Sequence, residues 1–222
     1  MGKSIAVLGL GNYGMSLAKE MYNMGADVLA VDKDEEKIKE IADHCTEAVC
    51  LDLSSEEEIT TLDLKSMDIV VCGMGKNLAA SIMAITVSKE QNVPVVVAKS
   101  SSLRMTSILK KIGADKVVVP EEENGKRSAR IIASDTLLDY FQVDDNLCMI
   151  EMNPAAEWVG KSLVELNLRK HYKINIVAKQ EDKDSKWELI NPSEKLSENS
   201  RLLIVLERSQ LEKMSKLGRL SD

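Results

Sequence analysis

Short apolar segments alternate with helical patterns through the first 120 residues, and this alternation constrains the fold more than any other feature. The segments in the middle of this region are apolar on both faces, as in strands of a parallel sheet that helices cover on both sides. The alternation therefore predicts an α/β domain with a doubly wound parallel sheet. The six expected strands are residues 4–8, 28–31, 48–51, 68–72, 94–98 and 116–119.

The pattern changes after Glu121. Residues 127–141 have the apolar spacing of one long helix, and the segments beyond it follow the order strand, helix and three strands. This βαβββ order predicts a second, smaller α+β domain. Its strands are expected at 147–152, 174–179, 187–189 and 202–207, and its short helix at 163–166. We place the domains at residues 1–143, including a long helix at about 126–141, and at 144–208; residues 209–222 are a tail that is either a short helix or frayed.

Composition and charge exclude several classes of protein. The 36 Asp and Glu residues outnumber the 29 Lys and Arg residues, and the net charge of -7 argues against nucleic acid as a partner. No apolar run approaches the roughly 18–20 residues of a membrane span, and the N-terminus enters a strand pattern without a signal peptide. The four cysteines form no C-x-x-C pair, so reduced thiols in a cytoplasmic protein are expected.

The first strand runs into Gly9-Leu10-Gly11-Asn12-Tyr13-Gly14, a G-x-G-x-x-G motif that opens a helix. In a Rossmann-like domain the first glycine makes a tight turn, the second lets the backbone approach a pyrophosphate, and the third lets the helix pack on the strand. Asp32 ends the second strand, where a carboxylate accepts hydrogen bonds from ribose hydroxyls and repels a 2′-phosphate. These residues predict a site for NAD, ATP, ADP or AMP rather than NADP. The alternative is a degenerate loop beside an empty cleft.

Further turns converge on the same crevice, because the carboxyl ends of parallel strands meet at one edge of a sheet. Asp52 follows the third strand, where it could meet an adenine amino group, and Ser54 or Ser55 is a good cap for the next helix. A glycine-rich turn follows the fourth strand, and Lys99, for which a solvated side chain is the alternative, ends the fifth. The residues predicted to bind the nucleotide are Gly9, Leu10, Gly11, Asn12, Tyr13, Gly14, Asp32, Lys33, Asp52, Leu53, Gly73, Met74, Gly75 and Lys99.

A redox enzyme would need more than this cleft. Hydride transfer requires an acid–base partner beside the nicotinamide and a domain that holds the substrate. No Tyr-x-x-x-Lys pair occurs, and the second domain offers only His171. Gly160-Lys161-Ser162 lacks the leading glycine of a Walker loop. The run Glu121-Glu122-Glu123 is either an acidic first helical turn or a site for a hard cation such as Mg²⁺ or Ca²⁺. A small NAD-dependent oxidoreductase is the alternative function.

Several short sequence segments of the chain resemble those of one known family. The G-x-G-x-x-G domain and residues 112–121, Ile-Gly-Ala-Asp-Lys-Val-Val-Val-Pro-Glu, resemble the RCK (KTN, or TrkA-N) domain of potassium-channel regulators. Residues 158–163, Trp-Val-Gly-Lys-Ser-Leu, and 166–169, Leu-Asn-Leu-Arg, resemble the RCK C-terminal (TrkA-C) domain. Together the two domains cover nearly the whole chain. The chain is thus similar to the cytosolic regulatory subunit of a Ktr or Trk potassium uptake system, the Ktr type most of all.

The resemblance implies a nucleotide-dependent switch and not an enzyme. Family members are homodimers that assemble into an octameric ring at the inner face of the membrane, under a potassium transporter subunit (KtrB- or TrkH-like). ATP or ADP, or NAD(H) in the Trk type, changes the shape of the ring. Residues 126–141 match a crossover helix between protomers, and Glu121 matches a carboxylate that can hold Mg²⁺ or Ca²⁺. Several members bind cyclic di-AMP in the second domain, and the matching positions here are Leu168, Arg169, Asn175, Ile176 and Pro192.

One residue departs from the Ktr pattern. Ktr subunits commonly carry Arg directly after the second glycine, where it can reach a γ-phosphate, and this chain has Asn12. A neutral amide makes weaker contacts with phosphate than a guanidinium does. The substitution argues against strong discrimination of ATP from ADP and leaves NAD(H) and AMP open as ligands.

Overall fold

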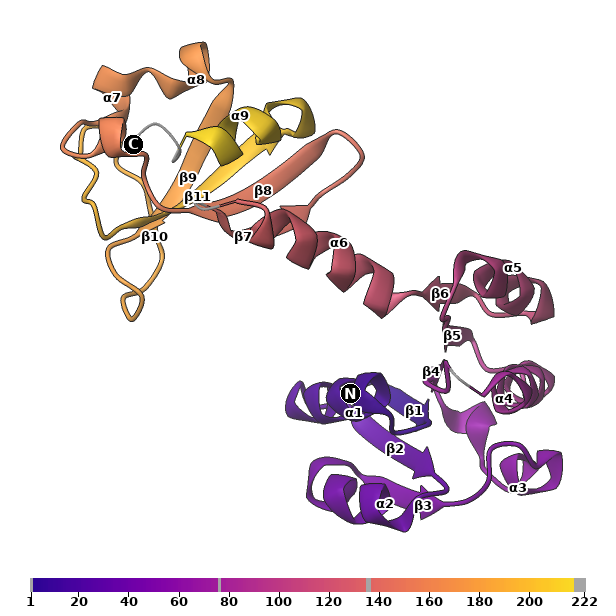
Figure 1. Cartoon of the computed structure of the whole chain (residues 1–222). Coiled ribbons are helices and arrows are strands. Elements are labelled where there is room, and N and C mark those ends of the chain that lie inside the picture. Colours follow the sequence, from indigo (N-terminus) through magenta and orange to yellow (C-terminus); the bar gives the residue numbers. More distant parts are fainter. Residues whose placement is uncertain (1, 76, 135–136, 218–222) are drawn as a thin grey trace. The chain divides into compact units, whose positions relative to one another are not determined.

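The computed structural model describes residues 2–75, 77–134 and 137–217 of the chain (Figure 1). The chain forms two compact units, Met1–Glu122 and Glu123–Asp222. This division lies before the boundary near Asp144 that the sequence pattern suggests. None of the described helices is both long enough and apolar enough to cross a membrane.

The first unit is built on a six-stranded parallel sheet with the order β3-β2-β1-β4-β5-β6, which confirms the predicted doubly wound fold. The order reverses between β1 and β4, and this reversal is the switch point at which such sheets bind ligands. The described strands of this sheet are β1 (Ser4–Leu8), β2 (Asp27–Asp32), β3 (Glu47–Cys50), β4 (Ile69–Cys72), β5 (Val95–Lys99) and β6 (Lys116–Val118).

Alternate residues of each strand point to opposite faces of this sheet, and helices cover both faces. Ala6 and Leu8 of β1 belong to one buried cluster, and Ile5 and Val7 belong to another. Ser55 accepts a hydrogen bond from the Glu58 amide and so caps α3, as predicted. The helices of this unit are α1 (Asn12–Asn23), α2 (Glu35–Ile41), α3 (Glu56–Thr60), α4 (Leu78–Glu90) and α5 (Leu103–Ile112), with short 3-10 turns η1 (Ala42–His44) and η2 (Leu64–Ser66).

The second unit contains a five-stranded antiparallel sheet with the order β10-β9-β11-β8-β7 (Figure 1). Its core surrounds Trp158, which is 1% exposed and packs edge-on against Tyr172. The strands are β7 (Leu137–Gln142), β8 (Leu147–Met152), β9 (Ile174–Gln180), β10 (Glu188–Leu189) and β11 (Arg201–Glu207). The helical elements are α6 (Pro120–Ile132), which begins before the unit boundary, η3 (Ala156–Trp158), α7 (Leu163–Leu166), α8 (Leu168–His171), η4 (Arg208–Gln210) and α9 (Leu211–Lys216).

The prediction of one helix through residues 126–141 is wrong in its second half. Helix α6 ends at Ile132, and Leu137–Gln142 forms strand β7. In this strand Tyr140 pairs with Ile150 of β8, so backbone pairing with a distant segment outweighs the local helical spacing. Positions 135 and 136 of the predicted helix lie outside the described residues. In the tail, α9 is the expected short helix, with Met214 buried, and the positions after 217 lie outside the described residues.

We expect acid to destabilise the second unit through two paired carboxylates. Hydrogen bonds from Lys179 and Ser197 lower the pKa of Glu181, and the bidentate contact with Arg127 lowers the pKa of Asp139. Both carboxylates therefore add stability above their unfolded pKa values, and this stability is lost as the pH falls through the lower folded values. The unfolding free energy should decrease between about pH 5 and about pH 3.

Urea unfolding followed by tryptophan fluorescence measures this effect selectively, since both tryptophans, Trp158 and Trp187, belong to the second unit. Glu181→Gln should flatten the pH dependence because an amide does not titrate there. Glu198 is exposed, and Glu198→Gln is the matched control. Equal pH slopes in the wild type and Glu181→Gln would contradict the assignment.

Candidate functional site

The candidate site lies where β1 and β4 end, at the switch point of the parallel sheet. Gly9 follows β1 and donates its amide to the Val31 carbonyl at 2.7 Å. Gly73 follows β4 and donates its amide to the Leu8 carbonyl at 2.7 Å. The two glycine turns therefore continue the backbone hydrogen bonding of the sheet and hold the edge of the crevice in place.

The glycines of the motif serve two different purposes. A Cβ atom on Gly14 would lie 2.0 Å from the Gly9 carbonyl oxygen, and one on Gly73 would lie 2.6 Å from the same oxygen. Gly9 itself has a φ of 95°, a conformation that favours glycine. A Cβ atom on Gly11, by contrast, would have no atom within 4 Å. Gly14 and Gly73 are thus required for packing and Gly9 for its backbone conformation, whereas Gly11 leaves an open space.

Helix α1 begins at this open space with its first turn uncapped. Gly11 is its N-cap residue and supplies no side-chain hydrogen bond, and the first turn contains no acidic residue. The free N–H groups and the positive end of the helix dipole at such an N-terminus attract anions. Asn12 is exposed in this turn and carries no charge. The geometry suits a phosphate group that approaches the backbone at Gly11.

The Asp32 carboxylate is held beside the glycine turn. Asp32 is 8% exposed, and its Oδ2 accepts a hydrogen bond of 2.6 Å from the buried Leu10 amide. Its Oδ1 accepts a second hydrogen bond, from the Asp34 amide, at 3.0 Å. Lys37 Nζ lies 3.4 Å from Oδ2, a weak contact that the sequence pattern did not reveal. The carboxylate is therefore ordered before any ligand binds.

Lys33 and Asp52 also lie together at the ends of β2 and β3, with Lys33 Nζ 3.9 Å from Asp52 Oδ2. Hydrogen bonds from the Ser54 hydroxyl and amide lower the pKa of Asp52, which keeps it ionised. Leu53 is buried in the core beside them, and its contact with a ligand stays a prediction. A contact of Asp52 with adenine stays a prediction.

Lys99 lies on the other side of the crevice, at the end of β5. Its side chain passes Gly75, where an added Cβ atom would be 3.3 Å from the Lys99 Cδ, and its ammonium lies 5.8 Å from the centre of the Tyr13 ring. The ammonium forms an ion pair with Glu121 in the first turn of α6. The Lys99 side chain is 16% exposed and is paired with Glu121, so it is not a solvated surface lysine. Met74, in the same turn as Gly75, lies against Gly9 of the turn that follows β1.

Glu121, the predicted ligand of a divalent cation, therefore has a cationic partner within its own protomer. Across the part of the chain that the structure describes, no group of three or more His, Cys, Asp or Glu side chains could hold a metal ion. A metal at Glu121 stays a prediction.

The residues matched to a second ligand lie on α8, on β9 and after β10. Arg169 and Asn175 are exposed, and Ile176 is partly buried. Leu168 is 5% exposed and belongs to the core of the second unit, so its side chain is already covered. The carbonyl of Pro192 accepts a hydrogen bond from the Val164 amide at 3.1 Å. Binding of a second ligand by these residues stays a prediction.

Comparison with known families identifies both parts of the chain. Residues 5–120 match the TrkA-N domain, and residues 149–217 match the TrkA-C domain. The first match contains the whole crevice, from Gly9 to Lys99.

Individual proteins agree with these matches. The chain is 33% identical to Ktr system potassium uptake protein A of Bacillus subtilis (strain 168), over 79% of each chain. It is 35% identical to Ktr system potassium uptake protein C of the same organism, over 83% of each chain. The crystal structure of the GsuK RCK domain has a TM-score of 0.65 at 16% identity, covering 98% of this chain and 48% of that one, and so shares the fold.

Proposed function

The chain belongs to the family of Ktr potassium uptake proteins that join a TrkA-N to a TrkA-C domain, and from this premise we propose that it is the nucleotide-binding regulatory subunit of a potassium transporter. The observation that carries the proposal is the ordered Asp32 carboxylate beside the open, uncapped N-terminus of α1. A carboxylate and a free helix N-terminus in this arrangement suit the ribose and the phosphates of one nucleotide.

An adenine nucleotide, either ATP or ADP or NAD(H), is the proposed ligand. Its ribose hydroxyls would donate to Asp32 and replace the weak contact with Lys37. Its phosphates would lie at Gly11 and the amides of α1, within reach of Lys99. Asp52 would accept a hydrogen bond from the adenine amino group. Asn12 adds no positive charge at the phosphates, so the proposal does not require a preference for ATP over ADP.

The ion pair between Lys99 and Glu121 offers a way for the ligand to act on the rest of the chain. Lys99 ends β5 inside the crevice, and Glu121 lies in the first turn of α6, the helix that continues into the second unit. A bound phosphate would compete with the Glu121 carboxylate for the Lys99 ammonium. A ligand shifts a conformational equilibrium only through contacts that differ between the two states. Lys99 would pair with Glu121 in one state and with the phosphate in the other, and so would provide such a difference.

Lys99→Met should reduce the response of potassium flux to nucleotide. Methionine keeps the apolar stem beside Gly75 and Tyr13 but removes the charge that a phosphate would meet. The measurement is potassium flux through proteoliposomes that contain the membrane-embedded transporter subunit and this chain, with ATP, ADP, NAD⁺ or NADH added in turn. We expect nucleotide to change the flux with the wild type by several-fold and to change it little with the variant, a loss of about 1–2 kcal/mol in coupling.

The exposed Lys110 in the last turn of α5 provides the control Lys110→Met, which should respond like the wild type. A wild-type flux that is indifferent to all four nucleotides would contradict the proposal. Oxidation of NADH by the chain with a carbonyl substrate would instead favour the oxidoreductase alternative.

The proposal extends to assembly at the cytoplasmic face of the membrane. By family membership we propose a homodimer that forms an octameric ring under the membrane subunit. We also propose that Mg²⁺ or Ca²⁺ binds at Glu121, because a carboxylate is a ligand for hard cations. Cyclic di-AMP would bind the second unit beside Arg169 and Asn175, which are exposed and can meet phosphate and base.

A further inference from the structure

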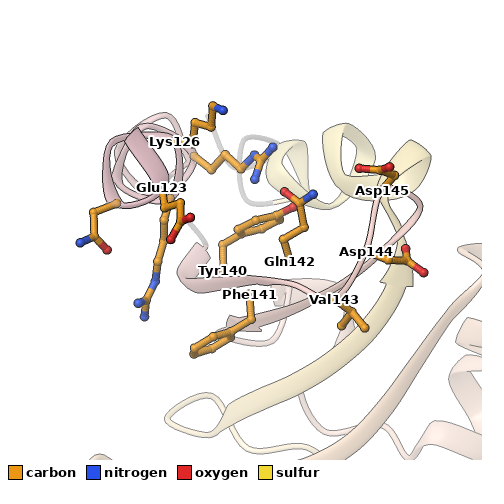
Figure 2. A pocket seen from close by; sticks show the side chains of 11 residues that line it. Glu123, Lys126, Tyr140, Phe141, Gln142, Val143, Asp144 and Asp145 are labelled. Atoms are coloured by element: carbon orange, nitrogen blue, oxygen red, sulfur yellow. The ribbon is translucent and has the colours of Figure 1, made fainter. Parts of the chain in front are cut away.

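A cavity of about 680 Å³ lies within the second unit, between α6 and the β7–β8 hairpin. All of its lining residues fall between positions 123 and 145, so it is separate from the nucleotide crevice and is formed within one compact unit. Its volume is in the range of small-molecule sites in proteins. Figure 2 shows Tyr140 on the same side of β7 as Lys126 and Asp145, and Phe141 on the other side.

Tyr140 has a buried hydroxyl that lacks a partner. The residue is 2% exposed, and no hydrogen bond reaches its hydroxyl from the residues that the structure describes. Buried polar side-chain atoms are bonded in the large majority of cases. A phenol can both donate and accept a hydrogen bond, so this hydroxyl is able to bond a polar group in the cavity.

The two arginines that line the cavity are in different situations. Arg127 is hydrogen-bonded to Asp139, with its Nε donating to Oδ1 at 2.8 Å. Its guanidinium lies 4.8 Å from the centre of the Phe141 ring. The Arg130 guanidinium lies 4.1 Å from the centre of the Tyr140 ring and forms no ion pair with another described residue. A guanidinium that stacks on a ring keeps its N–H donors at its edge. Arg130 therefore presents free donors beside the unpartnered hydroxyl.

Acidic side chains from α6 and from the loop after β7 also line the cavity. Asp144 accepts hydrogen bonds from the Asn146 and Leu147 amides at 2.7 and 2.6 Å, and Glu123 and Asp145 are exposed nearby. Three acidic side chains at the rim disfavour a ligand of high negative charge. We propose that this cavity binds a small molecule with a single oxyanion head, a carboxylate or a phosphate, which accepts hydrogen bonds from Tyr140 and Arg130.

Protection of Arg130 from phenylglyoxal tests this site in the full chain. Phenylglyoxal modifies accessible arginines, and peptide mass spectrometry reports the rate at each residue. The probes are inorganic phosphate for one head and succinate for the other, each compared with chloride at equal ionic strength. A probe at about ten times its dissociation constant should slow modification of Arg130 about tenfold. The exposed Arg104 in α5 is the internal control and should react at an unchanged rate.

Tyr140→Phe keeps the ring beside Arg130 and removes only the hydroxyl, so the protection should fall several-fold. The fluorescence of Trp158 and Trp187 checks that the variant is folded, and the wild-type measurement does not depend on that variant. Protection by phosphate, by succinate or by both supports the site and identifies its head group. The proposal is overturned by an unprotected Arg130, by equal protection in Tyr140→Phe, or by protection that follows protein concentration, which would assign the cavity to a contact with a second copy of the chain.

Discussion

Asp32→Ala is expected to weaken the binding of adenine nucleotides by about 10- to 100-fold, because hydrogen bonds to a charged group contribute about 1.5–3 kcal/mol. The carboxylate is 8% exposed and already oriented by the Leu10 and Asp34 amides, so binding need not order it. Titration calorimetry with ATP, ADP and NAD⁺ measures the loss directly. The same variant should also discriminate less against NADP⁺, since the charge that repels a 2′-phosphate is gone.

Two further variants separate binding from stability. Asp32→Asn keeps an oxygen that can accept from the Leu10 amide and removes the charge, so it should fold better than the alanine variant and still bind weakly. Asp27 lies exposed at the other end of β2, and Asp27→Asn should bind like the wild type. If Asp32→Ala bound nucleotides with unchanged affinity, the assignment of this crevice would fail.

Much of the fold could be predicted because its signals are local. Strands β1 and β8 have the predicted bounds, since each is a short apolar run that ends at a turn. Strand β7 was missed because residues 137–141 continue the helical spacing of α6, and only the pairing of Leu137–Gln142 with β8 makes this segment a strand. The cavity beside Tyr140 was missed for the same reason. If residues 126–141 formed one helix, no β7–β8 hairpin would lie beside α6 and line the cavity with it.

The candidate site divides in the same way. Gly9, Gly14 and Asp32 could be assigned from sequence because a strand, a tight turn and a helix fix their places within a short stretch of chain. The contact of Lys37 with Asp32 depends on where α2 begins, and the meeting of Lys99, Tyr13 and Glu121 depends on three separate elements of the unit. Spacing along the chain carries no signal for such contacts, although the sequence pattern does predict that Lys99 lies at the end of a strand.

Gly14→Ala should lower the stability of the protein, whereas Gly11→Ala should leave its stability nearly unchanged and weaken nucleotide binding. The Gly14 Cβ would lie 2.0 Å from a backbone oxygen, which cannot move without shifting the turn, so this variant should lose about 3 kcal/mol of unfolding free energy. Gly11 has a φ of -68° and open space around its Cβ position, so its alanine variant should stay within about 1 kcal/mol of the wild type. Scanning calorimetry measures both.

Nucleotide binding should nevertheless fall about tenfold or more in Gly11→Ala, because the added methyl occupies the space through which a pyrophosphate approaches the α1 amides. Gly125 in α6 also has open space around its Cβ position, and Gly125→Ala should leave the affinity unchanged. If alanine at position 11 is tolerated in the free protein but prevents nucleotide binding, the space beside Gly11 is the space that the nucleotide occupies. If Gly11→Ala bound ATP, ADP and NAD⁺ as tightly as the wild type, the opening at α1 would have no such role, and the nucleotide would have to bind elsewhere in the chain.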